Sequence, residues 1–182
     1  AIKEMEEAIQ LDPNESRVYG MLGALQMARG NQEEARAGFE KAVALDPKSV
    51  NARLALANYL WATNQPAAAE KSLQDAIALE PNDIRANRAL ATFYLATGRS
   101  AEAEKPLKTI AEADKTGIAS RLALADYYIL NKRETEARPL LTALIQDKQG
   151  FAEAQRRLAA LDFAAGQRES GHRLIDELLT KA

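Results

Sequence analysis

The residues that decide the fold are Ser16–Ser49, SRVYGMLGALQMARGNQEEARAGFEKAVALDPKS. Tyr19, Leu22 and other apolar or small residues recur at helical spacing before Gly30, and the pattern resumes after it until Pro47. This periodicity predicts two helices, one on each side of a turn at Gly30. Pro47 ends the second helix, because proline has no N–H to donate and disfavours helical geometry in the preceding residue.

The same skeleton returns with a period of thirty-four residues. The repeats begin at Ser16, Val50, Ile84, Ile118 and Ala152. One place in the first helix is always leucine, and a Gly or Ala follows it: Leu22, Leu56, Leu90, Leu124 and Leu158. The start of the second helix stays small as well, which lets the two helices approach closely: Ala1, Ala35, Ala69, Ala103, Ala137 and Gly171.

A helix–turn–helix unit with this period and these residues resembles the tetratricopeptide repeat family, over nearly the whole chain. The resemblance implies an all-α fold, a right-handed α-solenoid (superhelix) of antiparallel helix pairs. It also implies a domain order: the second helix of a truncated repeat at 1–15, then repeats at 16–49, 50–83, 84–117, 118–151 and 152–182. This fold is a scaffold, so its recognition alone does not define a function.

Composition excludes several classes of protein. The chain of 182 residues carries a net charge of −2, which argues against a general nucleic-acid binder. No apolar run is long enough to span a membrane, so no direct membrane insertion is expected. The lack of cysteine excludes disulfides and thiolate zinc sites.

The two ends suggest an excerpt from a longer protein. Ala1–Pro13 matches only the second helix of a repeat, and the chain does not start with Met, so any targeting sequence would lie upstream. The compartment therefore stays open between cytoplasm and bacterial periplasm or envelope; Ala-rich arrays of this style resemble bacterial tetratricopeptide proteins. No polar capping helix follows Lys181-Ala182, so we expect either end-to-end self-association or continuation of the parent chain.

The pattern becomes less regular after about residue 100, which predicts two sub-arrays. Pro106 and Pro139 fall inside their second helices, where each removes a hydrogen bond and is expected to bend the helix. Gly117 and Gly150 replace the acidic-Pro pairs that separate the earlier repeats.

Few residues could carry catalysis, and we expect no enzyme activity and no cofactor. His172 is the single histidine, and Glu169 and Asp176 share its helix face in a pattern that could in principle hold a metal. A solvated outer helix face explains this pattern better, so no metal site is expected. No glycine-rich phosphate loop is present.

The resemblance assigns ligands to the concave face lined by first helices. The twelfth place of each repeat forms an apolar row there: Met27, Trp61, Leu95, Ile129 and Phe163. Polar and basic residues stand beside it at the second, fifth and ninth places, among them Asn58, Arg85, Arg88 and Arg156. Trp61 would anchor a peptide. The alternative is that the row only packs between adjacent repeats.

The first helices of the five repeats are basic, taken as residues 16–29, 50–63, 84–97, 118–131 and 152–165. They contain eight arginines and no lysine, against Asp126, Glu153 and Asp162, so their net charge is 8 − 3 = +5 and the remainder of the chain carries −7. Because arginine suits carboxylate capture, we expect a protein or peptide partner that offers an acidic-hydrophobic segment. The carboxylate clamp of chaperone-binding tetratricopeptide domains is matched by Asn58, but Leu54 stands in place of its lysine and Ala89 in place of its second asparagine, which argues against that ligand class.

Two alternatives stay open beside this interaction module. The repeats could be an architectural spacer within a larger multi-repeat protein, or they could assist a catalytic domain elsewhere in the parent chain.

Overall fold

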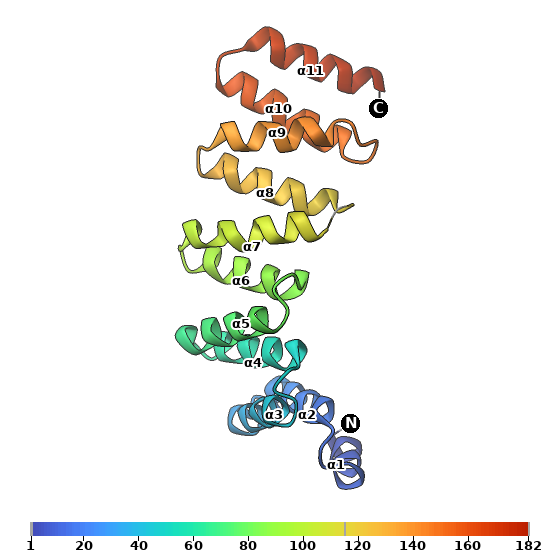
Figure 1. Cartoon of the computed structure of the whole chain (residues 1–182), viewed down its shortest axis with the longest axis vertical. Helices are drawn as coiled ribbons and strands as arrows, with labels where there is room; N and C mark the ends of the chain where they lie inside the picture. Colours follow the sequence, from blue (N-terminus) through green and yellow to red (C-terminus); the bar gives the residue numbers. More distant parts are fainter. Residues whose placement is uncertain (1, 115, 182) are drawn as a thin grey trace. The chain divides into compact units, whose positions relative to one another are not determined.

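The computed structural model describes residues 2–114 and 116–181, except for the side chain of Lys181. The small residue expected at Ala1 lies outside the described residues. Every regular element in these ranges is an α-helix (Figure 1). The eleven helices found there are α1 (Ile2–Leu11), α2 (Ser16–Ala28), α3 (Gln32–Leu45), α4 (Val50–Ala62), α5 (Pro66–Leu79), α6 (Ile84–Ala96), α7 (Ser100–Ala113), α8 (Ile118–Leu130), α9 (Glu134–Leu144), α10 (Phe151–Ala164) and α11 (Arg168–Lys181). The all-α class expected from the sequence is confirmed.

The chain forms two compact units, one ending at Ala103 and the next beginning at Glu104. This division lies close to the change of pattern expected near residue 100. Within the first unit each helix from α1 to α6 contacts the next, and α4 also contacts both α2 and α6. Within the second unit α8 pairs with α9, α9 contacts α10, and α10 pairs with α11.

The turn inside each helix pair uses the same backbone conformation. The residue at the fifteenth place of the repeat lies in this turn and has a positive φ, between 57° and 83°, in all five pairs: Gly30, Asn64, Gly98, Lys132 and Gly166. Glycine adopts this conformation without steric cost and asparagine tolerates it, whereas lysine does not favour it. Lys132 is therefore the strained member of the series.

Small residues set the spacing within the first helix pair. A Cβ at Gly23 would lie 3.0 Å from the Ala35 carbonyl oxygen, and a Cβ at Gly38 would lie 2.8 Å from the Gly23 Cα. The backbones of α2 and α3 thus approach more closely than any larger residue permits.

The core of the second unit has large side chains at its centre. Leu141 and Leu144 are fully buried there.

The two helices with a proline in their interior both continue past it. α7 runs beyond Pro106 to Ala113, and α9 runs beyond Pro139 to Leu144. The bend expected at each proline stays a prediction. None of the helices in the described ranges combines the length and apolarity needed to cross a bilayer.

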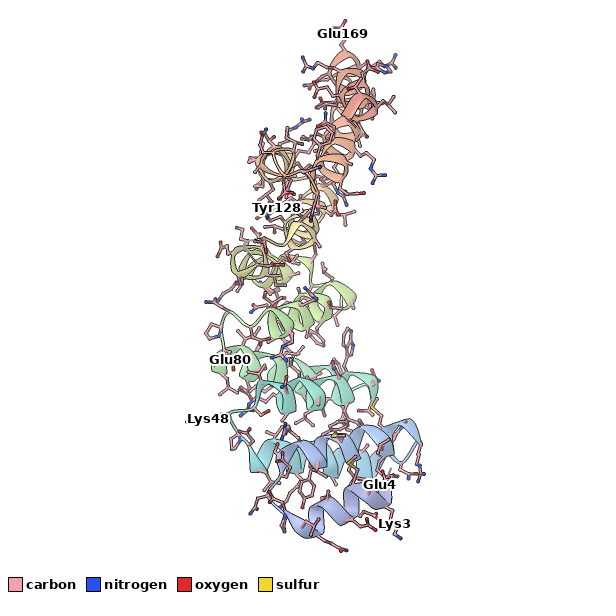
Figure 2. The ribbon with its side chains drawn as sticks, turned by 90° about the vertical axis from the view of Figure 1, so that its right-hand side faces the viewer. Lys3, Glu4, Lys48, Glu80, Tyr128 and Glu169 are labelled. Atoms are coloured by element: carbon pink, nitrogen blue, oxygen red, sulfur yellow. The ribbon has the colours of Figure 1, made fainter. Side chains whose placement is uncertain are left out.

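A three-residue clamp joins α5 to α6. The Tyr94 hydroxyl donates to Glu70 Oε1 at 3.1 Å, and Arg99 Nη2 donates to the same oxygen at 2.9 Å. The Arg99 guanidinium also lies 4.7 Å from the Tyr94 ring centroid, a cation–π contact. The equivalent residues one repeat later form the same clamp in the second unit, where Tyr128 is labelled in Figure 2: Glu104, Tyr128 and Arg133.

One repeat further on, the charges of this contact are reversed. Arg138 on α9 takes the place of Glu104, and Asp162 on α10 takes the place of Tyr128. Arg138 Nη1 donates to Asp162 Oδ1 at 2.7 Å, and the Asp162 carboxylate is buried. The carboxylate of this contact therefore lies on α7 in the Glu104 clamp and on α10 in the Arg138–Asp162 ion pair.

Candidate functional site

Two pockets open on the first unit where its first helices α2, α4 and α6 lie in series. The pocket between α4 and α6, the α4–α6 pocket, has a volume of about 310 Å³ and is lined by Asn58, Trp61, Arg85, Arg88 and Thr92, among others. The pocket between α2 and α4, the α2–α4 pocket, has a volume of about 690 Å³. The helix α4 contributes side chains to both.

The wall of the α4–α6 pocket is held by an aromatic contact. Trp61, near the end of α4, packs against Phe93 of α6 with ring centroids 5.4 Å apart and an interplanar angle of 70°. Phe93 is almost fully buried, whereas Trp61 is half-buried and also faces the pocket. Edge-to-face contact with a fixed ring holds the indole in place and leaves part of its surface for a ligand.

The two arginines of this pocket differ in their partners. Arg85 donates from Nη2 to Asp83 Oδ2 at 2.9 Å and from Nη1 to Asn51 Oδ1 at 2.7 Å. The hydrogen bond with Asp83 raises the pKa of Arg85 and lowers the pKa of that carboxyl. Arg88 is exposed and forms no side-chain hydrogen bond or ion pair with residues 2–114 or 116–181. Its guanidinium is free to receive a carboxylate.

The expected residues therefore separate into groups. Asn58, Trp61, Arg85 and Arg88 come together around one pocket. Met27 and Leu95 of the same unit are 38% and 47% exposed but line neither pocket. Their role in binding stays a prediction.

The three expected residues in the second unit have neighbours of their own. Ile129 packs against the core cluster, as the packing alternative for the apolar row predicts. Arg156 forms an ion pair with Glu153. Phe163 is 39% exposed and stacks edge-to-face on His172, with ring centroids 5.2 Å apart.

Most of the positive charge expected along the first helices is paired inside the chain. Arg157 Nε donates to Asp126 Oδ1 at 2.6 Å, and this hydrogen bond raises the pKa of Arg157. Further arginines have acidic partners nearby: Arg17 with Glu15, Arg53 with Asp75, and Arg156 with Glu153. Fewer arginines are therefore available to bind a carboxylate of a ligand than the number of arginines in the first helices suggested.

The α2–α4 pocket was not identified from the sequence. Its lining includes Gly20, Met21, Ala24 and Ala55, and Met21 is 52% exposed. The sequence signal for this pocket was Gly20, which stands where the other repeats carry leucine or arginine. Gly20 has no side chain that could bind a ligand, so its position was not counted among the candidate residues.

The outer face of α11 carries Glu169, His172 and Asp176 along an open surface. In the described ranges, no three His, Cys, Asp or Glu side chains are grouped so that they could hold a metal ion.

Residues 5–115 match a protein family described as the cytochrome c-type biogenesis protein H TPR domain. No curated protein matches the chain in sequence. Among solved structures, YrrB, described as a TPR protein with an unusual peptide-binding site, is 17% identical with a TM-score of 0.71, over 100% of this chain and 93% of YrrB. MamA is 19% identical with a TM-score of 0.70, over 91% of each chain. PilF of Pseudomonas aeruginosa is 20% identical with a TM-score of 0.62, over 92% of this chain and 76% of PilF. Likeness at these identities establishes the fold alone.

Proposed function

Since the chain belongs to the tetratricopeptide repeat domain family of cytochrome c-type biogenesis protein H, we propose that it is an interaction module that binds an acidic-hydrophobic segment of a partner protein. The family match agrees with the resemblance inferred from the repeats. This fold is generally a non-catalytic scaffold for protein partners.

The observation that carries the proposal is that Trp61 and Arg88 line the same pocket. Trp61 offers a partly open aromatic surface, and Arg88 offers a guanidinium with no partner among the described residues. An aromatic anchor next to arginine is the composition that dominates binding energy at protein interfaces. A carboxylate would make charge-assisted hydrogen bonds with Arg88 while an adjacent apolar group covers the indole.

The first experiment is a selection of displayed random dodecapeptides on the immobilised chain, followed by titration of synthetic copies. These probes are acetylated and amidated, so that every carboxylate comes from a side chain. Because Trp61 is the single tryptophan, its fluorescence reports binding at the pocket directly. Selected peptides are expected to contain acidic residues and to shift Trp61 emission.

The matched variants are Arg88→Glu and Arg168→Glu, which change the charge equally. Arg168 is exposed and lines neither pocket, so its variant is the control. Arg88→Glu is expected to weaken binding by about ten-fold or more, since one attraction becomes a repulsion. Equal affinities for the two variants, or the absence of any selected peptide, would contradict the proposal and favour the spacer alternative.

A further inference from the structure

The α2–α4 pocket is lined in part by Gly20, which holds the fifth place of the first repeat. The other repeats carry a long side chain at this place: Leu54, Arg88, Leu122 and Arg156. A Cβ added at Gly20 would meet only the Ala42 Cβ, at 3.9 Å, which is an ordinary van der Waals distance. Packing therefore does not require glycine here.

The contrast with the neighbouring glycines sharpens this observation. A Cβ at Gly23 or Gly38 would lie 3.0 Å or less from backbone atoms of the facing helix, so those two glycines are demanded by helix packing. Gly20 weakens α2 without serving such a contact, since glycine is a poor helix former.

The pocket suits a large apolar side chain. Phe39, Ala42, Ala55 and the 52% exposed Met21 belong to the apolar part of its lining. The polar part of the lining consists of Glu15, Ser16, Arg17, Asp46, Ser49 and Asn51. Methionine is flexible and polarisable, so it adapts to ligands of different shape. The volume of about 690 Å³ leaves ample space for an aromatic or long aliphatic group.

The two pockets lie on either side of α4 and are joined by a hydrogen bond. Asn51 lines the α2–α4 pocket, Arg85 lines the α4–α6 pocket, and Arg85 Nη1 donates to Asn51 Oδ1 at 2.7 Å. Neighbouring helices lie about 8–10 Å apart. An extended chain advances about 3.3 Å per residue, so a step from one pocket to the other takes about three residues.

We propose that the first unit recognises a two-residue signature in an extended partner segment, with a large apolar residue in the α2–α4 pocket and an acidic residue three positions away at Arg88. The occupant follows from complementarity: the apolar part of the α2–α4 pocket and the Arg88 guanidinium, which has no partner among the described residues, together fit a side-chain pair of this chemistry. The inference rests on the proposed function, because it specifies the ligand of the same surface.

The test uses the peptides selected on the unaltered chain. Their sequences are expected to share an apolar and an acidic residue at a spacing of three, and insertion of two serines between them should weaken binding at least ten-fold. Gly20→Leu fills the pocket with the side chain that Leu54 and Leu122 carry at the same place, so it should fold normally and lose about ten-fold in affinity. Gly20→Ala is the control, since it strengthens the helix yet leaves the pocket open, and should bind as the unaltered chain does.

A double-mutant cycle assigns the contact. Replacing the apolar residue of the peptide by serine should cost about ten-fold against the unaltered chain and nothing against Gly20→Leu, because the contact is already lost. If Gly20→Leu binds selected peptides normally while Arg88→Glu does not, the two-residue signature is refuted and the proposed function stands. If Arg88→Glu also binds normally, both are refuted.

Discussion

Replacing Glu104 by glutamine tests how much the clamp in the second unit stabilises the fold. Hydrogen bonds from Arg133 and Lys108 lower the pKa of Glu104 from its ordinary 4.5 to about 2. A lowered pKa stabilises the folded state above the unfolded pKa, and this contribution is lost as pH falls from about 4.5 towards 2. Glutamine keeps the size of the side chain and an acceptor for the Tyr128 hydroxyl but has no charge.

The size of the effect follows from the pKa and the exposure. The full lowering of the Glu104 pKa, from 4.5 to about 2, corresponds to at most about 3–4 kcal/mol of unfolding free energy. The Arg133 side chain is 36% exposed, so water screens the pair and the contribution falls to about 1–2 kcal/mol. We expect Glu104→Gln to lower the free energy of unfolding by this amount at pH 7, and the two proteins to become equally stable near pH 2.

The assay is urea denaturation followed by far-ultraviolet circular dichroism at several pH values. Glu112→Gln is the control, because Glu112 lies exposed on the same helix and should change stability by only a few tenths of a kcal/mol. A stability difference between Glu104→Gln and the unaltered chain that stays constant from pH 7 to pH 2.5 would refute the reasoning, since a charge interaction must titrate.

Three further changes have clear expected outcomes. Lys132→Gly should raise the unfolding free energy by up to about 1 kcal/mol, because it relieves a lysine held at φ 57°; a lower melting temperature would contradict this. Leu141→Ala should cost about 2–5 kcal/mol in urea denaturation, since the side chain is fully buried, and a cost under 1 kcal/mol would show that the core collapses around the gap. Arg138→Glu should destabilise the chain by facing Asp162 with a like charge, and adding Asp162→Arg should recover part of the loss; no recovery would mean that the pair is not coupled.

The helices could be predicted from the sequence because their apolar residues recur at helical spacing, and some of them also begin at a capping residue. Ser49 and Asp83 stand before helices and accept hydrogen bonds from Ala52 N and Ala86 N, the pattern of an N-terminal cap. The grouping of Trp61 with Arg88 follows from counting places along a regular repeat, and the structure does bring them to one pocket. Whether that pocket binds a peptide stays a prediction.

The pairing of individual arginines could not be predicted in the same way. Arg157 reaches Asp126 across a helix interface, and the direction of two long side chains depends on rotamers that periodicity does not encode. The Arg85–Asn51 contact could have been predicted, since the two residues hold the same place in consecutive repeats. The charge count along the first helices therefore overstated the positive charge left for a ligand.

The reversed pair of Arg138 and Asp162 has a consequence for how the array assembles. Because successive repeats are alike, a second helix can in principle dock on the wrong first helix during folding. If α7 took the place of α9 on α10, Glu104 would face Asp162. This wrong arrangement would bring two carboxylates together in a partly buried contact, so the polarity of the Arg138–Asp162 ion pair favours the correct neighbour.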